Sequence, residues 1–300
     1  MALKEVLRKF LPSAVLDQFR SWKKNQRRRQ LRQQALAGKG LTKAELLQQL
    51  QQMGIAPGDT VMVHCSMSQL GFVQGGPTTM CEAFLEAIGP KGHLLMPSSP
   101  IKTLQLAFAQ HHQTVDLRTI PSAMGALSET FRAWPGVKRS PHPTEPVLAW
   151  GQQAAWLTEG HRGQITPYNA NSPYRRMMQL NGKILYAGVT LDNAGTHLHT
   201  LEDAVDFPYP VYHPQVFRFQ LTDQEGHQET VETKVHNPVW SVQRRCDELI
   251  PMFERASVLD RFPLGQAECL LLNAQGMLNT MLEAFHERRV TMYHPQGQVE

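Results

Sequence analysis

The chain has 300 residues, of which 41% are hydrophobic and 19% charged, a composition typical of a globular protein with a sizeable core. No apolar run approaches the ~20 residues needed to span a bilayer, and the N-terminal residues lack the uninterrupted apolar region and cleavage site of a secretory signal. The four cysteines form no Cys-x-x-Cys pair, so we expect reduced thiols and a cytoplasmic location.

The net charge of +4 is unevenly distributed, and this asymmetry separates an N-terminal extension from the body. Residues 1–40 carry eleven Lys or Arg and two acids, which leaves nineteen basic and twenty-four acidic residues for 41–300. Apolar residues recur at helical spacing in two stripes, one over 3–11 and one formed by Val15, Leu16, Phe19 and Trp22, with a restart at Pro12-Ser13. Residues 1–40 are therefore predicted to be a helical, basic, amphipathic extension.

Three roles suit such an extension. Basic residues beside Leu, Phe and Trp favour peripheral contact with an anionic membrane, which would place the protein at the inner face of the membrane. Packing on the body or on a partner subunit is the structural alternative. Nucleic-acid binding is the third, and we expect no specific nucleic-acid partner.

Residues 41–300 alternate between strand-like and helical patterns. Thr42 is a predicted N-cap and Gly54 a predicted stop for the first helix of the body. The predicted strands are 60–66, 93–98 and 183–188, with an antiparallel pair at 217–222 and 229–236. The further predicted helices are 78–88, 122–134, 151–160, 172–180, 241–255 and 273–289. Strands alternating with helices predict an α/β fold with a mixed sheet flanked by helices.

The stretch GTHLHTLED (195–203) concentrates the residues that carry chemistry. Histidine is the side chain suited to removing a proton near neutral pH, and it is also a common metal ligand. Thr196 and His199 are three residues apart and would share a helix face, while His197 would point elsewhere and be structural. A metal site needs further ligands in a defined motif, and the other histidines show none, so no metal is expected.

Segments spread over residues 55–206 resemble the antibiotic N-acetyltransferase family, best known for the aminoglycoside 3-N-acetyltransferases. The matching segments are DTVMVHCSMSQLGFVQGG (59–76), HLLMPS (93–98), MGALSETFRAWPGVKRSPHPTEPVLAWG (124–151), SPYRRM (172–177) and GKILYAGVTLDNAGTHLHTLED (182–203). Their joint order and spacing carry the resemblance. The C-terminal third matches loosely, and residues 1–40 lie outside it.

The resemblance implies an antibiotic N-acetyltransferase-like fold over 41–300 and transfer of acetyl from acetyl-CoA to a primary amine by direct attack. The family's Thr-x-x-His signature falls on Thr196 and His199. His199 is then the general base, and Thr196 would donate to the oxyanion or the departing thiolate. A carboxylate must orient the imidazole; Glu202 and Asp247 are both candidates.

The resemblance also implies a site for acetyl-CoA. The loop after the first strand of the body brings backbone N–H groups and small residues toward a phosphate. Arg139 could instead have a structural role, in which it holds the register of the chain through a contact with Glu129. The residues expected around acetyl-CoA are His64, Ser66, Met67, Ser68, Gly75, Gly76, Ser98, Arg139, Ser140 and His142.

The acceptor is expected to be a small amine of an amino sugar or aminoglycoside-like compound, with Asp203 and Asp206 as binding carboxylates. Trp150 replaces a residue that is commonly small in the family, and DAVDFPYPVYHP (203–214) is aromatic and acidic. Two other functions stay open: a non-catalytic interaction protein on the same fold, and a metal-dependent amidohydrolase that uses the histidines of 197–199.

Overall fold

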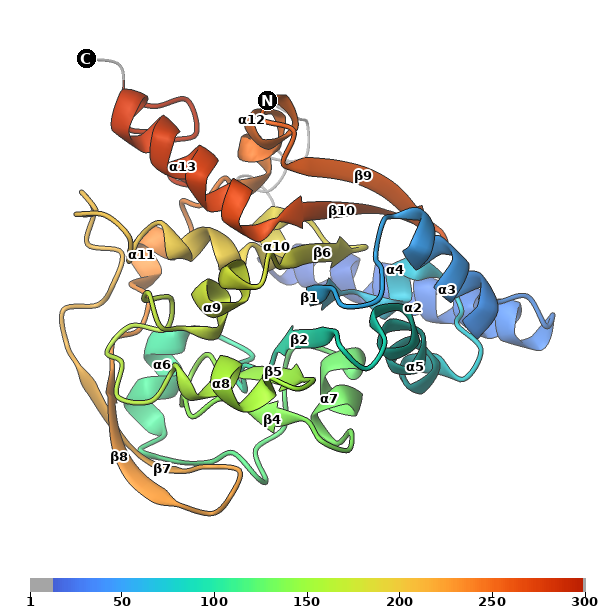
Figure 1. The fold of residues 1–300 in the computed structure, drawn as a ribbon, viewed down its shortest axis with the longest axis horizontal. Coiled ribbons are helices and arrows are strands. Elements are labelled where there is room, and N and C mark those ends of the chain that lie inside the picture. Colours follow the sequence, from blue (N-terminus) through green and yellow to red (C-terminus); the bar gives the residue numbers. More distant parts are fainter. Residues whose placement is uncertain (1–12, 299–300) are drawn as a thin grey trace.

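The centre of the molecule is a seven-stranded mixed β-sheet with helices on both faces (Figure 1). The structure is a computed structural model and describes residues 13–298. In sheet order the strands are β4 (Lys138–Arg139), β5 (Val147–Trp150), β2 (His93–Pro97), β1 (Thr60–Cys65), β6 (Lys183–Ala187), β10 (Ala267–Asn273) and β9 (Leu259–Leu264). Strands β2, β1 and β6 are parallel, and every other pairing in this sheet is antiparallel. The predicted α/β fold with a mixed sheet is confirmed.

The central strands are buried on both faces, which explains their almost continuous apolar sequences. Val61 and Val63 pack in one hydrophobic cluster and Met62 in the other, because successive strand residues point to opposite faces. The helices on the Val61 side are α3 (Lys43–Gln52), α5 (Gly76–Ile88) and α7 (Ala126–Arg132). Those on the Met62 side are α8 (Ala154–Glu159), α9 (Pro173–Gln179), α12 (Ile250–Arg255) and α13 (Ala274–Arg288).

A second, smaller sheet has its own apolar cluster. It consists of β3 (Thr114–Asp116), β7 (Phe217–Thr222) and β8 (Gln228–Thr233). Strands β7 and β8 form the antiparallel pair that their alternating sequences predict, whereas β3 adds in parallel and was not predicted. Helix α6 (Gln105–His111) contributes Phe108, which stacks on Phe219 of β7 with ring centroids 6.4 Å apart.

The local sequence signals predicted some helix boundaries correctly and others wrongly. Thr42 caps α3 through a complete capping box with Glu45, as predicted. The helix expected over 122–134 begins only at Ala126, because Gly125 adopts φ of 103°. The helix expected over 241–255 is instead three short pieces: α11 (Pro238–Ser241), the 3-10 turn η2 (Cys246–Leu249) and α12.

The hairpin of β9 and β10 is the largest feature that the sequence patterns missed. Leu264 pairs with Ala267 across a two-residue turn in which Gly265 has φ of 60°. Pro263 is tolerated because β9 is the edge strand of the sheet. The hairpin supplies two strands where only loop was expected before the last helix.

Most of the predicted N-terminal extension is one long helix, α2, described over Ser13–Leu36. Arg27 anchors it to the body by donating to the carbonyl oxygens of Ser68 (2.5 Å) and Gln69 (3.0 Å), at the short helix α4 (Met67–Leu70). The second apolar stripe faces solvent at Val15, Phe19 and Trp22, which are 44%, 52% and 55% exposed. The first stripe, over 3–11, lies outside the described residues.

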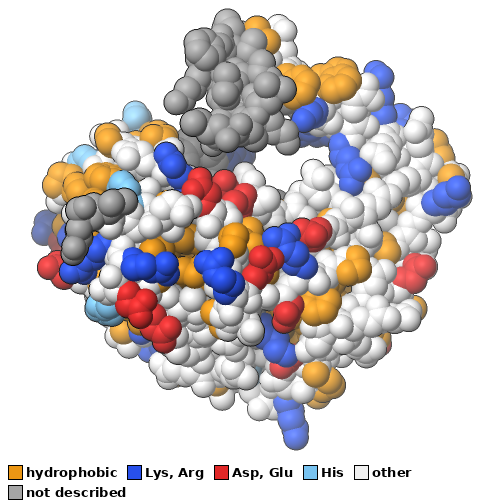
Figure 2. All heavy atoms as spheres, turned by 90° about the horizontal axis from the view of Figure 1, so that it is seen from above, with side chains coloured by type: hydrophobic (Ala, Val, Ile, Leu, Met, Phe, Trp, Pro, Cys, Tyr) orange, Lys and Arg blue, Asp and Glu red, His pale blue; other side chains and the backbone are white. Residues whose placement is uncertain are grey.

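Within residues 13–298, every helix falls short of the combination of length and apolarity needed to cross a bilayer. On the face seen in Figure 2, positive and negative side chains are interspersed rather than collected by sign. All four cysteines are free thiols, as the sequence predicts.

Candidate active site

The stretch GTHLHTLED lies just beyond the carboxyl end of β6, where open α/β sheets commonly bind ligands. After the short helix α10 (Leu191–Ala194), residues Thr196–Thr200 form a 3-10 turn, η1, rather than the expected α-helix. Side chains at i and i+3 eclipse one another in a 3-10 helix. Thr196 and His199 therefore still share one face, and both line a cavity of about 800 Å³.

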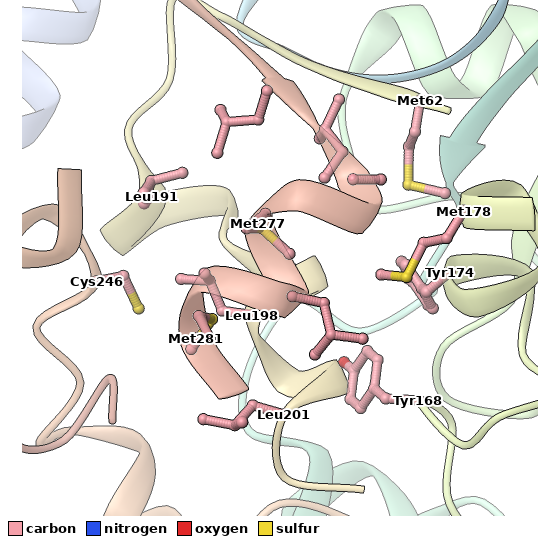
Figure 3. Packing of buried hydrophobic residues seen from close by; sticks show 14 of the residues in the cluster. Met62, Tyr168, Tyr174, Met178, Leu191, Leu198, Leu201, Cys246, Met277 and Met281 are labelled. Carbon is pink, nitrogen blue, oxygen red and sulfur yellow. The ribbon is translucent and has the colours of Figure 1, made fainter. Parts of the chain in front are cut away.

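Apolar residues hold this turn in place from behind. Leu198 and Leu201 are fully buried in the cluster that contains Met277 and Met281 of α13 (Figure 3). His197 is also fully buried, with Nε2 3.1 Å from the sulfur of Met177, in agreement with a structural role. The burial of Leu198 and Leu201 therefore holds the turn in one orientation, in which Thr196 and His199 face the cavity.

His199 belongs to a buried polar cluster centred on Glu202. Nδ1 of His199 lies 2.9 Å from Glu202 Oε1, although the angle falls short of a linear hydrogen bond. The Tyr293 hydroxyl donates to the same oxygen at 2.6 Å, and His236 Nε2 lies 3.1 Å from Oε2. Nε2 of His199 has no hydrogen-bond partner among the described residues, so it is the nitrogen left for a ligand.

The charges in this cluster follow from burial. Burial lowers the pKa of His199 to about 3 despite the opposing charge of Glu202, so the imidazole is neutral near pH 7. Burial acts to raise the pKa of Glu202, but the contacts with His199 and His236 outweigh it and hold the pKa below its ordinary value. An ionised carboxylate only accepts hydrogen bonds, so the protons sit on Nδ1 of His199 and Nε2 of His236. That tautomer leaves Nε2 of His199 as a lone-pair base.

Glu202 and Asp247 were both candidates for orienting His199, and only Glu202 touches it. Asp247 instead accepts from the backbone N–H of Asp192 at 3.1 Å, while the Asp247 N–H donates to Asp192 Oδ1 at 3.1 Å. This reciprocal pair joins η2 to α10. The described contacts of Asp247 are therefore structural.

Four of the residues expected around acetyl-CoA line the cavity beside Thr196 and His199. They are His64, Ser66, Met67 and Ser68, at and beyond the end of β1. His64 stacks on Tyr186 with ring centroids 4.9 Å apart and has a buried Nε2 without a partner. Cys65 also lines the cavity and packs against the apolar cluster of the Val61 side, and burial raises the pKa of its thiol, so it is not a ready nucleophile.

The other six expected residues lie away from this lining. Arg139 is buried and donates to the carbonyl oxygens of Leu117, Ile120 and Ser98 at 2.7–2.9 Å. The expected pairing of Arg139 with Glu129 is wrong, because Glu129 pairs with Arg132 at 2.7 Å. Arg139 therefore ties three loop carbonyl groups together, although its buried Nε has no partner among the described residues.

Ser98, Ser140 and His142 are also fully buried. Ser140 Oγ lies 2.8 Å from His161 Nδ1 and accepts from the Val147 N–H at 2.7 Å. His142 Nδ1 accepts from the Glu145 N–H at 3.0 Å. Burial makes these groups inaccessible to ligands, so the described contacts of Ser140 and His142 are structural.

Gly75 and Gly76 form the turn that starts α5. Both have positive φ, 75° and 64°, and a Cβ on Gly75 would meet the Thr79 hydroxyl at 2.1 Å. Backbone geometry alone accounts for these glycines.

Asp203 and Asp206, expected to bind the acceptor, are also outside the cavity lining. Asp203 accepts from the Tyr212 hydroxyl at 2.9 Å and the Tyr168 N–H at 3.2 Å, and burial raises its pKa to about 6. Asp206 is exposed. Asp203 therefore has its hydrogen-bond partners within the protein, and Asp206 lies on the surface.

Sequence analysis missed four residues of this site: Glu145, His236, Arg244 and Tyr293. Glu145 and His236 are buried and line the cavity, where burial raises the pKa of Glu145 to about 7. Gln105 joins the two, since its amide donates to Glu145 and accepts from the His236 N–H at 2.9 Å. Of the four, only Glu145 had a sequence signal, because it lies in SPHPTEP (140–146), within the segment 124–151 that carries the family resemblance. The others come from the loosely matched C-terminal third.

The ligand atoms of His199, Glu202 and His236 lie within 4.8 Å of one another, so these three side chains could converge on a metal ion. In the tautomers given above, however, both nitrogens nearest the carboxylate carry protons. A metal ion at this point would have to displace the protons on His199 Nδ1 and His236 Nε2. It would also have to replace the Tyr293 hydroxyl as the partner of Glu202.

Most of the chain is similar to known proteins. The family model described as aminoglycoside 3-N-acetyltransferase matches residues 62–286. Aminoglycoside N(3)-acetyltransferase III of Pseudomonas aeruginosa is 30% identical over 190 residues, 57% of this chain and 69% of that protein. Aminoglycoside N(3)-acetyltransferase IV of a Salmonella species is 36% identical over 170 residues, 56% of this chain and 61% of that protein. The chain thus spans about two thirds of the length of these relatives.

Solved structures show the same fold. AAC-VIa bound to sisomicin aligns with a TM-score of 0.67 at 28% identity, covering 82% of this chain and 97% of that one. AAC-IIIb in a binary complex with CoASH aligns with a TM-score of 0.68 at 20% identity, covering 83% and 98%, which shows the fold alone. The family match covers the strands, the 3-10 turn and most of the cavity lining, and the chain belongs to the aminoglycoside 3-N-acetyltransferase family of amine N-acetyltransferases.

Proposed function

We propose that this protein transfers an acetyl group from acetyl-CoA to a primary amine of an amino sugar or aminoglycoside-like acceptor by direct attack, with His199 as general base. The observation that carries the proposal is the contact between His199 Nδ1 and Glu202, which leaves Nε2 unpartnered at a cavity of about 800 Å³. Such a cavity has the volume of a small-molecule site.

In the reaction, Nε2 of His199 takes a proton from the amine as its nitrogen bonds to the thioester carbonyl carbon. Glu202 stabilises the imidazolium that forms. The C–S bond then breaks, and the CoA thiolate receives the proton from His199. Burial keeps the resting imidazole neutral but also weakens it as a base, and the adjacent carboxylate offsets this by stabilising the protonated form.

Thr196 is the proposed donor to the oxyanion or thiolate. Its hydroxyl now donates to the Ala194 carbonyl at 3.1 Å, from which it can rotate toward a ligand in the cavity. His64, Ser66, Met67 and Ser68 are the proposed acetyl-CoA contacts, since they line the same cavity.

The test uses His199→Gln, with release of CoA followed on a panel of primary amines. We expect kcat to fall ~10²–10⁴-fold, the usual effect of losing a general base, while the affinity for CoA measured by calorimetry stays within about threefold. His286→Gln is the matched control, because His286 is exposed on α13. Turnover by His199→Gln at the wild-type rate would remove His199 from the mechanism.

The second candidate function, a metal-dependent amidohydrolase, is favoured by the convergence of His199, Glu202 and His236. Metal analysis of the purified protein and amide hydrolysis with added Zn²⁺ decide between the two. One equivalent of bound metal together with hydrolysis that a chelator abolishes would replace the transferase proposal. A non-catalytic protein on the same fold would show neither activity.

For α2 we propose peripheral contact with an anionic membrane surface. Phe19 and Trp22 stack with centroids 5.9 Å apart and project from the helix, and the Lys23 ammonium lies 4.7 Å from the centre of the Phe19 ring. Exposed aromatic side chains beside lysines suit the interface of an anionic bilayer.

A further inference from the structure

Arg244 brings a positive charge into the cavity and forms no salt bridge with a carboxylate of residues 13–298. It lines the same cavity as His199, His236 and Glu145. Its one hydrogen bond within residues 13–298 runs from Nε to the Tyr293 hydroxyl, at 3.5 Å, and its Nη2 is buried without an acceptor. Buried polar groups are almost always paired in folded proteins, so an unpaired guanidinium at a ligand cavity calls for a ligand.

The chain fixes Arg244 in this position. The next residue, Arg245, donates its backbone N–H to the Met292 carbonyl at 2.8 Å, and Cys246 is buried in the apolar core. The side chain of Arg245 is exposed, so the two neighbouring arginines differ in what they face. One lines the cavity and the other reaches solvent.

Arg244 shares this part of the cavity with the base and with one acid. Burial lowers the pKa of His199 and His236, and the charge of Arg244 lowers both further. For Glu145 burial raises the pKa, and the charge of Arg244 opposes that rise. Glu145 is held by Gln105, which also binds the His236 backbone, so the acid is tied to the His236–Glu202–His199 cluster.

This balance of charge does not suit a polycation. Glu145 and Asp192 are the only acids in the described lining, and Asp192 is engaged with the backbone of Asp247. A compound with several ammonium groups would need more carboxylates and would meet the guanidinium. A compound with one amine and one anionic group would match the pair formed by Glu145 and Arg244.

We infer that the acceptor is a small monoamine that also carries an anionic group, with the anion bound by the Arg244 guanidinium and the amine placed between His199 and Glu145. This inference rests on the proposed acetyl transfer and narrows its substrate class. Arginine binds carboxylate and phosphate with the same two-pronged geometry, so the shared chemistry is a planar or tetrahedral oxyanion.

The experiment compares four acceptors with wild type: glucosamine, glucosamine 6-phosphate, 2-aminoglucuronic acid and sisomicin. We expect kcat/KM for at least one anionic amine to exceed that for glucosamine and for sisomicin by ~10²-fold, the scale of a charge-assisted pair. The phosphate and carboxylate arms identify which oxyanion is preferred.

Arg244→Gln should remove this preference, lowering kcat/KM for the preferred anionic amine by ~10–10²-fold and leaving that for glucosamine within about threefold. Arg244→Lys should retain part of it, because lysine keeps the charge but loses the fork. Arg245→Gln is the matched control and should behave as wild type. A thermal melt of each variant reports folding independently of activity.

Binding separates failure of this inference from failure of the proposed function. Calorimetry with enzyme saturated in CoA, titrated with glucosamine 6-phosphate, 2-aminoglucuronic acid and glucosamine, needs no turnover. Anion-selective binding that Arg244→Gln abolishes supports the inference even if no amine is acetylated, a result that would overturn only the transferase. Equal loss for all acceptors, a preference for sisomicin, or weaker binding of CoA itself in Arg244→Gln would overturn the inference.

Discussion

Glu202→Gln is the sharpest test of how the site works, because the substitution keeps the size of the side chain, removes its charge and leaves one of its two acceptor oxygens. Oε1 of Glu202 lies 2.9 Å from His199 Nδ1 and is fully buried. Two unit charges ~4 Å apart interact by about 4 kcal/mol at an effective dielectric constant of ~20. The glutamine carbonyl still accepts a hydrogen bond, so we assign about half, roughly 2 kcal/mol, to the lost charge.

That loss applies to the transition state, in which His199 becomes positive, and not to the resting state, in which it is neutral. Since about 1.4 kcal/mol corresponds to a factor of ten in rate, kcat should fall ~30-fold, with little change in KM for acetyl-CoA. The assay is steady-state CoA release with a thiol reagent, using any accepted amine at saturating acetyl-CoA.

Two further variants make the result specific. Asp247→Asn tests the other carboxylate considered from sequence, and we expect kcat to stay within about threefold because Asp247 contacts Asp192 and not His199. Glu248→Gln, at an exposed position, is the surface control. A wild-type kcat in Glu202→Gln, or an equal fall in Asp247→Asn, would refute the assignment of Glu202.

Further predictions concern the donor, acid stability and the N-terminal helix. Thr196→Ala should lower kcat by on the order of 10–10³-fold through loss of one transition-state hydrogen bond, and Thr196→Ser should recover most of it; equal defects would assign the methyl group rather than the hydroxyl. Burial lowers the pKa of His64 and His199 to about 3 and that of His161 to about 4, against 6.5 when unfolded. The unfolded chain therefore binds protons first as pH falls, and each histidine should reduce the free energy of unfolding by up to about 1.4 kcal/mol per pH unit from pH 6.5 downward. Glu145 acts in the opposite sense, since its raised pKa of about 7 stabilises the fold at low pH and that contribution is lost as pH rises from 4.5 through 7. Urea unfolding at pH 7.5, 6 and 5 measures the combined effect on the free energy of unfolding. A free energy of unfolding that does not change with pH would contradict the conclusion that the histidines outweigh Glu145. Phe19→Ser with Trp22→Ser should abolish sedimentation with anionic vesicles and leave the melting temperature unchanged, with Leu36→Ser, also exposed, as control; wild-type protein that ignores vesicles would reject membrane contact.

Local sequence determined much of this protein. The capping box at Thr42 and the buried strand TVMVHC follow from signals within a few residues, and the structure has both of them. The spacing of Thr196 and His199 placed both on one face even though the turn is 3-10 rather than α, because i and i+3 lie together in either helix.

Tertiary structure decided which partners these residues have. The orienting carboxylate was ambiguous in sequence, since Glu202 is three positions from His199 and Asp247 is forty-eight; folding pairs Asp247 with Asp192 and leaves Glu202 against the imidazole. Arg139, Ser140 and His142 resembled ligand-binding residues but are buried and have partners inside the protein, and a sequence motif does not show whether its residues are exposed. His236, Arg244 and Tyr293 come from segments without a motif, after β8, before η2 and after α13. The tertiary fold, and not a local pattern, brings His236 and Tyr293 within hydrogen-bonding range of Glu202 and Arg244 into the cavity wall.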